Sequence, residues 1–188
     1  MEAFFVSAAV VAIAEIGDKT QLLALMLAAR YRKPIPIILG IFCATLANHA
    51  LAAWVGAEVA AWIGADAMRW VLAVTFIAMA GWCLIPDKAD DGPQAARQAG
   101  AFLATLVAFF LVEIGDKTQI ATVALAARFN SLIAVTAGTT VGMLLANVPV
   151  VLFGDAIAKR LPLKWVRAAA AILFLLLGLA AIFMPSAR

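Results

Sequence analysis

The sequence has few of the residues that build disulfides or soft-metal sites. It contains only two cysteines and one histidine in 188 residues. Cys43 and Cys83 lie in separate apolar runs and form no paired motif, so we expect neither a disulfide nor a thiolate metal site. Both thiols are expected to pack as small buried hydrophobes.

Motifs of soluble enzymes are missing as well. The chain has no HExxH motif, no phosphate-binding loop and no plausible pairing of a nucleophile with a base. We therefore expect no enzymatic activity and no resident cofactor. An intramembrane enzyme or an assembly scaffold is the weakest of the alternatives.

Charge is also scarce, because charged residues make up 13% of the chain and hydrophobic residues 66%. A soluble domain of this size could not hide so much apolar surface. The lipid bilayer is thus the expected partner of the chain. The net charge of +3 lies mainly in short loops, which indicates membrane topology and no binding of nucleic acid.

Six apolar segments are close to the length of about 20 residues that a spanning helix needs. The segments cover roughly residues 3–28, 35–57, 67–85, 101–127, 131–153 and 165–185. The first has no basic region before it and contains three charges, so we expect a spanning helix and not a cleavable signal peptide. The predicted fold class is an all-α membrane protein with six transmembrane helices.

The chain contains an internal repeat. The heptapeptide EIGDKTQ occurs at residues 15–21 and again at 113–119, an offset of 98. Weaker matches follow in the same order, namely LAN at 46–48 and 145–147, Gly56 and Gly154, and Phe76 and Phe174. These matches predict two three-helix repeats, residues 1–86 and 101–188, joined by a polar cytoplasmic linker at 87–100. Because three is an odd number, the second repeat is expected to be inverted in the membrane.

The distribution of lysine and arginine predicts the orientation. One face of the predicted membrane protein carries nine of these residues: Arg30, Arg32, Lys33, Lys88, Arg97, Lys159, Arg160, Lys164 and Arg167. The opposite face carries three: Arg69, Arg128 and Arg188. The richer face is predicted to be cytoplasmic, which places both termini outside the cytoplasm.

Each heptapeptide places charges in the middle of an apolar segment. On a continuous helix, Glu15, Asp18 and Lys19 would share one face because they are three and four residues apart. The second copy places Glu113, Asp116 and Lys117 in the same way. Charges near the bilayer midplane cost at least a few kcal/mol unless they face a partner or water. We therefore expect the two motifs to meet at the centre of the protein.

The charges of the two motifs do not cancel. Four carboxylates and two ammonium groups give −4 + 2 = −2. One divalent cation or two protons would neutralise this sum, and carboxylates that crowd together titrate as a coupled set. Competition between metal and protons predicts a cation/proton antiporter, with 1:2 exchange as a hypothesis.

The candidate ligands are oxygen atoms, which suit Mn²⁺, Ca²⁺ or Mg²⁺. They belong to Glu15, Asp18, Glu113, Asp116, Thr20, Thr118, Gln21, Gln119, Asn48 and Asn147. Neither motif contains cysteine or histidine, which argues against zinc or copper.

Several of these assignments have structural alternatives. The motifs could form only a salt-bridge network between helices, and the two asparagines could serve only as interhelical hydrogen-bond donors. Lys19 and Lys117 either balance charge or gate the site. His49 has Val148 at the aligned position of the other repeat, so it is predicted to be a packed polar residue and not a ligand.

The paired E-x-G-D-K-T motifs resemble those of the GDT family of membrane cation/proton exchangers, and the resemblance covers nearly the whole chain. It implies that the acidic motif residues act on the transported ion, and it singles out Mn²⁺, with Ca²⁺ as the other candidate. Bacterial members of the family are similar to manganese exporters, which implies the inner membrane as the location. The chain lacks the long acidic or histidine-rich central loop of some members.

A second function remains open at this point. An exporter of a small cationic organic solute, such as an amino acid, would also use midplane carboxylates, but it would need a larger cavity. Faces rich in alanine and glycine leave a homodimer open as well.

Overall fold

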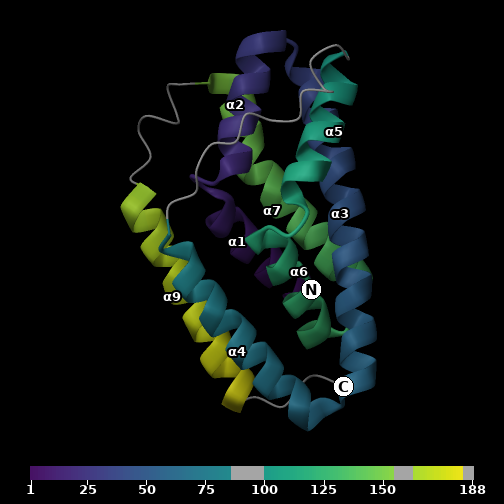
Figure 1. Ribbon diagram of the computed structural model, residues 1–188, viewed down its shortest axis with the longest axis vertical. Coiled ribbons are helices and arrows are strands. Elements are labelled where there is room, and N and C mark those ends of the chain that lie inside the picture. Colours follow the sequence, from purple (N-terminus) through teal and green to yellow (C-terminus); the bar gives the residue numbers. More distant parts are fainter. Residues whose placement is uncertain (86–99, 155–162, 184–188) are drawn as a thin grey trace.

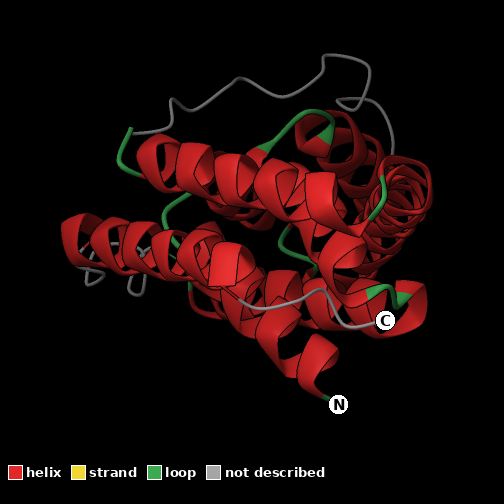
Figure 2. Ribbon diagram, turned by 90° about the horizontal axis from the view of Figure 1, so that it is seen from below, coloured by secondary structure: helices red, strands yellow, loops and turns green. Residues whose placement is uncertain are grey.

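The described part of the chain is helical throughout (Figure 2). The computed structural model describes residues 1–85, 100–154 and 163–183. The helices are α1 (Glu2–Glu15), α2 (Lys19–Tyr31), α3 (Pro34–Ile63), α4 (Ala65–Cys83), α5 (Ala101–Glu113), α6 (Lys117–Phe129), α7 (Leu132–Phe153) and α9 (Leu163–Phe183), labelled in Figure 1. The all-α prediction is confirmed for these residues. The linker predicted at 87–100 lies outside the described residues except for its last residue. Five of the basic residues used to predict the orientation also lie outside them: Lys88, Arg97, Lys159, Arg160 and Arg188.

Four of the helices are long and apolar enough to cross a bilayer. They are Pro34–Ile63, Asp66–Cys83, Leu132–Phe153 and Lys164–Phe183. Each falls on one of the predicted apolar segments, and together they make this a multi-pass membrane protein.

The other two predicted segments are each interrupted, which corrects the expectation of a continuous helix there. The segment 3–28 divides into α1 and α2, of 14 and 13 residues. The segment 101–127 divides into α5 and α6, of 13 residues each. Each of these short helices measures only about 20 Å, less than the hydrocarbon core of a bilayer.

The interruption has the same geometry in both segments. Gly17 and Gly115 have φ angles of 81° and 75°, in the left-handed region that favours glycine. The isoleucine before each glycine is extended, and the aspartate after each glycine takes the N-cap position of the next helix. Glycine and aspartate side by side therefore end one helix and start the next.

The two halves of the chain pack mainly against each other. Helix α3 of the first half lies against α5 and α6, and α7 of the second half lies against α1 and α2. Figure 1 shows these helices as one bundle, with the α4–α9 pair side by side at its edge. Phe76 of α4 and Phe174 of α9, which are repeat mates, stack with ring centroids 6.3 Å apart.

Equivalent glycines allow two close helix crossings. A Cβ on Gly40 of α3 would lie 2.7 Å from Thr105 Cβ and 2.9 Å from Phe102 O of α5. A Cβ on Gly138 of α7 would meet Ser7 Cβ at 3.0 Å and would collide with Phe4 O of α1. The two contacts are equivalent, because Gly138, Phe4 and Ser7 correspond to Gly40, Phe102 and Thr105 at an offset of 98.

The crossing at Gly138 yields a stability prediction. We expect Gly138→Ala to destabilise the protein by about 1–3 kcal/mol, because α1 and α7 must separate to admit the methyl group. The matched control is Gly81→Ala, since Gly81 lies in α4 and a Cβ there meets nothing within 4 Å. Thermal unfolding of both variants in detergent measures the difference. Equal melting temperatures would contradict the close crossing.

Candidate cation-binding site

The two interruptions bring the acidic motif residues to helix ends. Glu15 and Glu113 are the last residues of α1 and α5, while Asp18 and Asp116 cap the starts of α2 and α6. The expectation that each motif forms one face of a continuous helix is therefore wrong. The break at each glycine turns the backbone, so the carboxylates are placed by two short helices in each half.

A glutamine holds each interruption in shape. Gln21 Oε1 accepts a hydrogen bond of 2.9 Å from Gly17 N, and Gln119 Oε1 accepts one of 2.7 Å from Gly115 N. Gln21 Nε2 also donates to Ala146 O of α7 at 3.0 Å. The structure thus gives these amides a role in the backbone turn, and their role as metal ligands stays a prediction.

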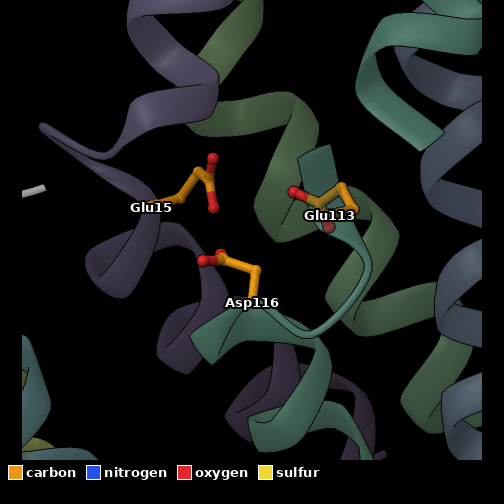
Figure 3. A group of neighbouring side chains, drawn as sticks. All are labelled: Glu15, Glu113 and Asp116. Carbon is orange, nitrogen blue, oxygen red and sulfur yellow. The ribbon is translucent and has the colours of Figure 1, made fainter. Parts of the chain in front are cut away.

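Three carboxylates from the two motifs converge in the interior. One oxygen each of Glu15, Glu113 and Asp116 lie within 4.8 Å of one another, and all three side chains are buried. Figure 3 shows these carboxylates turned toward one another from α1, α5 and the start of α6. The predicted meeting of the motifs is present in the structure. Asp18, the fourth predicted acid, is not in this group.

The lysines pair across the motifs. Lys19 Nζ lies 3.1 Å from Asp116 Oδ1, and Lys117 Nζ lies 2.9 Å from Asp18 Oδ1. The two pairs differ in burial, since the Lys19 side chain is 22% exposed and that of Lys117 is 5% exposed. The crossed pairs tie the two halves together, as the salt-bridge alternative requires.

The crossed pairs do not neutralise the site. Lys117 offsets Asp18, which leaves Glu15, Glu113 and Asp116 with Lys19, a formal sum of −3 + 1 = −2. The ion pairs of Lys19 and Lys117 are made with the two aspartates. Buried charges without compensation are costly, so this group favours a divalent cation or protons.

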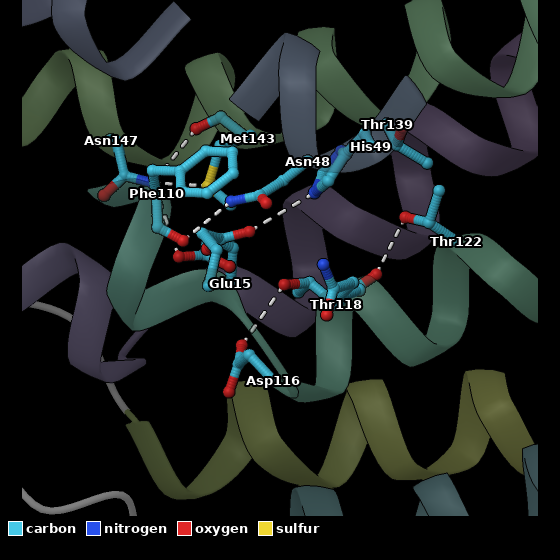
Figure 4. Close-up of polar contacts among 12 residues, drawn as sticks. Glu15, Asn48, His49, Phe110, Asp116, Thr118, Thr122, Thr139, Met143 and Asn147 are labelled. Carbon is cyan, nitrogen blue, oxygen red and sulfur yellow. Dashed lines mark hydrogen bonds and ion pairs between the residues drawn. The ribbon is translucent and has the colours of Figure 1, made fainter. Parts of the chain in front are cut away.

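Each glutamate receives one polar side chain from the opposite half. Figure 4 labels Glu15 and the two side chains that reach the glutamates, Asn147 and His49. Asn147 of α7 places Nδ2 3.4 Å from Glu15 Oε1. His49 of α3 places Nε2 3.3 Å from Glu113 Oε2. The structural mate of His49 is therefore Asn147, at the offset of 98, and not Val148.

The correspondence of His49 with Asn147 corrects two expectations from the sequence. The LAN match aligns Asn48 with Asn147 at an offset of 99. The equivalent glycine crossings show instead that residues of α3 correspond to residues of α7 at an offset of 98. Asn48 Nδ2 instead donates to Phe110 O of α5 at 3.0 Å, as a helix-to-helix hydrogen bond. His49, expected to be a packed polar residue, is in contact with one of the site's carboxylates. The sequence signal that could have identified it is the glycine pair Gly40 and Gly138.

The motif threonines differ between the halves. Thr118 Oγ1 donates to Asp116 Oδ2 at 3.2 Å, whereas Thr20 Oγ1 is buried with no hydrogen-bond partner among the described residues. Glu15 Oε2 and Glu113 Oε1 are also buried without such a partner. Buried polar atoms are normally satisfied, so these orphaned oxygens indicate a group that accepts a ligand.

A small pocket lies beside the first interruption. Gly17, Asp18 and Lys117 line it together with Arg167 of α9. The pocket thus reaches one of the crossed ion pairs from the side of the α4–α9 pair.

Comparison with known proteins gives one family and several relatives. Residues 3–91 and 101–187 match the family described as divalent cation/proton antiporter GDT1. A Vibrio cholerae protein named "Putative manganese exporter" is 58% identical over 184 residues, which cover 97% of this chain and 92% of the relative. In Oryza sativa, GDT1-like protein 3 is 25% identical and GDT1-like protein 4 is 27% identical, each over 98% of this chain and about three quarters of the relative. No solved structure matches the chain.

Proposed function

Because the chain belongs to the GDT1 family of divalent cation/proton antiporters, we propose that it exports Mn²⁺ in exchange for protons, with Ca²⁺ as a second cation. The observation that carries this proposal is the buried group of Glu15, Glu113 and Asp116 with its formal charge of −2. The name of the Vibrio cholerae relative supports manganese as the exported ion.

Ion and protons would compete for the same oxygens. A divalent cation between the three carboxylates and two protons on them are equivalent in charge, so binding of one releases the other. The short distances in the group suit a bare ion and leave little room for an organic solute. An exchange of one ion for two protons would then be electroneutral.

We place the protein in the bacterial inner membrane, with both termini outside the cytoplasm. In this proposal, residues 1–86 and 101–188 are inverted repeats of three spans each, and the interrupted helices α1–α2 and α5–α6 each count as one span. The matched interruptions and glycine crossings support this arrangement. Interrupted helices at a midplane ion site are a recurrent feature of inverted-repeat transporters.

The packing of the α4–α9 pair suggests how access alternates. Helix α9 packs against α1, and helix α4 packs against α6. The repeat-related contacts would join α4 to α5 and α9 to α2. Neither of these pairs has a comparable contact among the described residues. Accordingly, Ile16 is half-buried but its mate Ile114 is 55% exposed. If the halves exchange conformations, the pair leaves α1 and α6 and packs against α5 and α2, which opens the site to the other side.

Reconstituted transport tests the function. We expect liposomes that contain the protein and have an acidic interior to take up Mn²⁺ while protons leave. We expect them to take up Mg²⁺ poorly. The rate should not change when a potassium gradient and valinomycin set the membrane potential, because the 1:2 exchange moves no net charge. Proton flux driven by a cationic amino acid and not by metal would instead establish the alternative function.

A further inference from the structure

His49 makes the two halves of the site chemically different. Asn147 offers an amide to Glu15, while the structurally equivalent His49 offers an imidazole to Glu113. An amide can give a cation only an oxygen. An imidazole gives it a nitrogen, and imidazole nitrogen is the commonest metal ligand in proteins.

The imidazole ring is completely enclosed. Its exposed fraction is 0%, and its Nδ1 has no hydrogen-bond partner in the part of the chain that the structure describes. Burial of a polar ring that leaves one nitrogen unsatisfied costs free energy. The ring is nevertheless held there with its other nitrogen, Nε2, directed at Glu113 of the acidic group.

The geometry around Glu113 suits a shared ion. Two ligands at right angles around an ion, each at about 2.2 Å, lie about 3.1 Å apart. His49 Nε2 and Glu113 Oε2 are 3.3 Å apart, and the oxygens of the three acids lie within 4.8 Å of one another. Small shifts of these side chains would let one ion contact the imidazole and the carboxylates together.

We propose that His49 Nε2 is a ligand of the transported ion and that it biases the site toward Mn²⁺ and against Ca²⁺ and Mg²⁺. This inference rests on the proposed function, because it concerns the ion that the three acids hold. Ca²⁺ and Mg²⁺ are hard cations that take oxygen ligands. First-row transition ions also accept imidazole nitrogen. One nitrogen in an otherwise oxygen-lined site therefore separates the two classes of cation.

The chain offers a direct spectroscopic test, because it contains a single histidine. The protein is purified through a tag without histidine, loaded with Mn²⁺ alone, and studied by electron spin echo envelope modulation. We expect a nitrogen coupling that changes when only histidine is labelled with ¹⁵N. This test uses the wild-type chain, so it does not depend on how a variant folds.

A variant measures the effect on selectivity. His49→Asn places in α3 the residue that α7 carries at the equivalent position, so the interior already accommodates this side chain once. We expect the ratio of Mn²⁺ to Ca²⁺ transport to fall about 10-fold and the histidine coupling to be lost.

The outcomes separate this inference from the proposed function. Bound Mn²⁺ with no coupling to histidine nitrogen would overturn the ligand role and leave the carboxylate site standing. A coupling together with an unchanged transport ratio in His49→Asn would overturn the role in selectivity. Failure of the wild-type protein to bind or transport any divalent cation would overturn the proposed function and this inference with it.

Discussion

Replacement of either buried glutamate by glutamine is expected to abolish Mn²⁺ transport. Glu15→Gln and Glu113→Gln keep the shape of the side chain but remove one negative charge from the group of three acids. Loss of an outer-shell partner of a metal site already costs up to about 100-fold in affinity or activity. Loss of a carboxylate ligand should therefore lower the rate at least about 100-fold.

Transport by the purified variants in liposomes checks this expectation, with gel filtration as proof that they are folded. The matched control is Glu58→Gln, because Glu58 is an exposed carboxylate on α3. If Glu15→Gln and Glu113→Gln transported Mn²⁺ at the rate of Glu58→Gln, the site would be wrongly placed.

The second large effect concerns the buried ion pair between Lys117 and Asp18. Removal of one partner leaves a charge in the interior, which typically costs about 3–5 kcal/mol. We expect Lys117→Met to reduce stability by this amount, since both side chains are at most 5% exposed. The double variant Lys117→Met with Asp18→Asn should recover most of the loss, because neither partner of this pair then leaves the other charged and unpaired.

The repeat supplies the matched comparison for this experiment. Lys19→Met breaks the equivalent pair with Asp116, but the Lys19 side chain is 22% exposed and partly solvated. Its loss should destabilise the protein less than the loss of Lys117. Thermal unfolding in detergent measures all three variants. An equal effect of the two lysine substitutions would show that burial does not determine the strength of these pairs.

The duplicated heptapeptide was enough to predict that the two motifs meet, because charges in lipid must find partners. It did not show that Asp18 lies outside the group of three acids. It did not reveal that the helices are interrupted. A single glycine is tolerated in membrane helices, so apolar length alone could not distinguish one span from two half-helices. The pair Gly17–Asp18, with its copy Gly115–Asp116, joins a helix-ending residue to an N-cap residue. That pair is the local signal of the break.

The role of His49 depended on the register between helices, which short sequence matches did not determine correctly. The LAN match paired Asn48 with Asn147, one residue away from the spatial relation. A shift of one residue rotates a side chain by about 100° around a helix. Only the close crossings at Gly40 and Gly138 show which side chains face the acids.

The packing of each half against the other has a consequence for how the protein is made. Helices α1 and α2 rest on α7, and α3 rests on α5 and α6, so the first half has few of its final neighbours until the second half is inserted. About one hundred residues follow α4 in the chain. At about 5–20 residues per second, their synthesis takes roughly 5–20 s. During that time Glu15, Asp18 and Lys19 lack Asn147, Lys117 and Asp116, which are their partners from the second half.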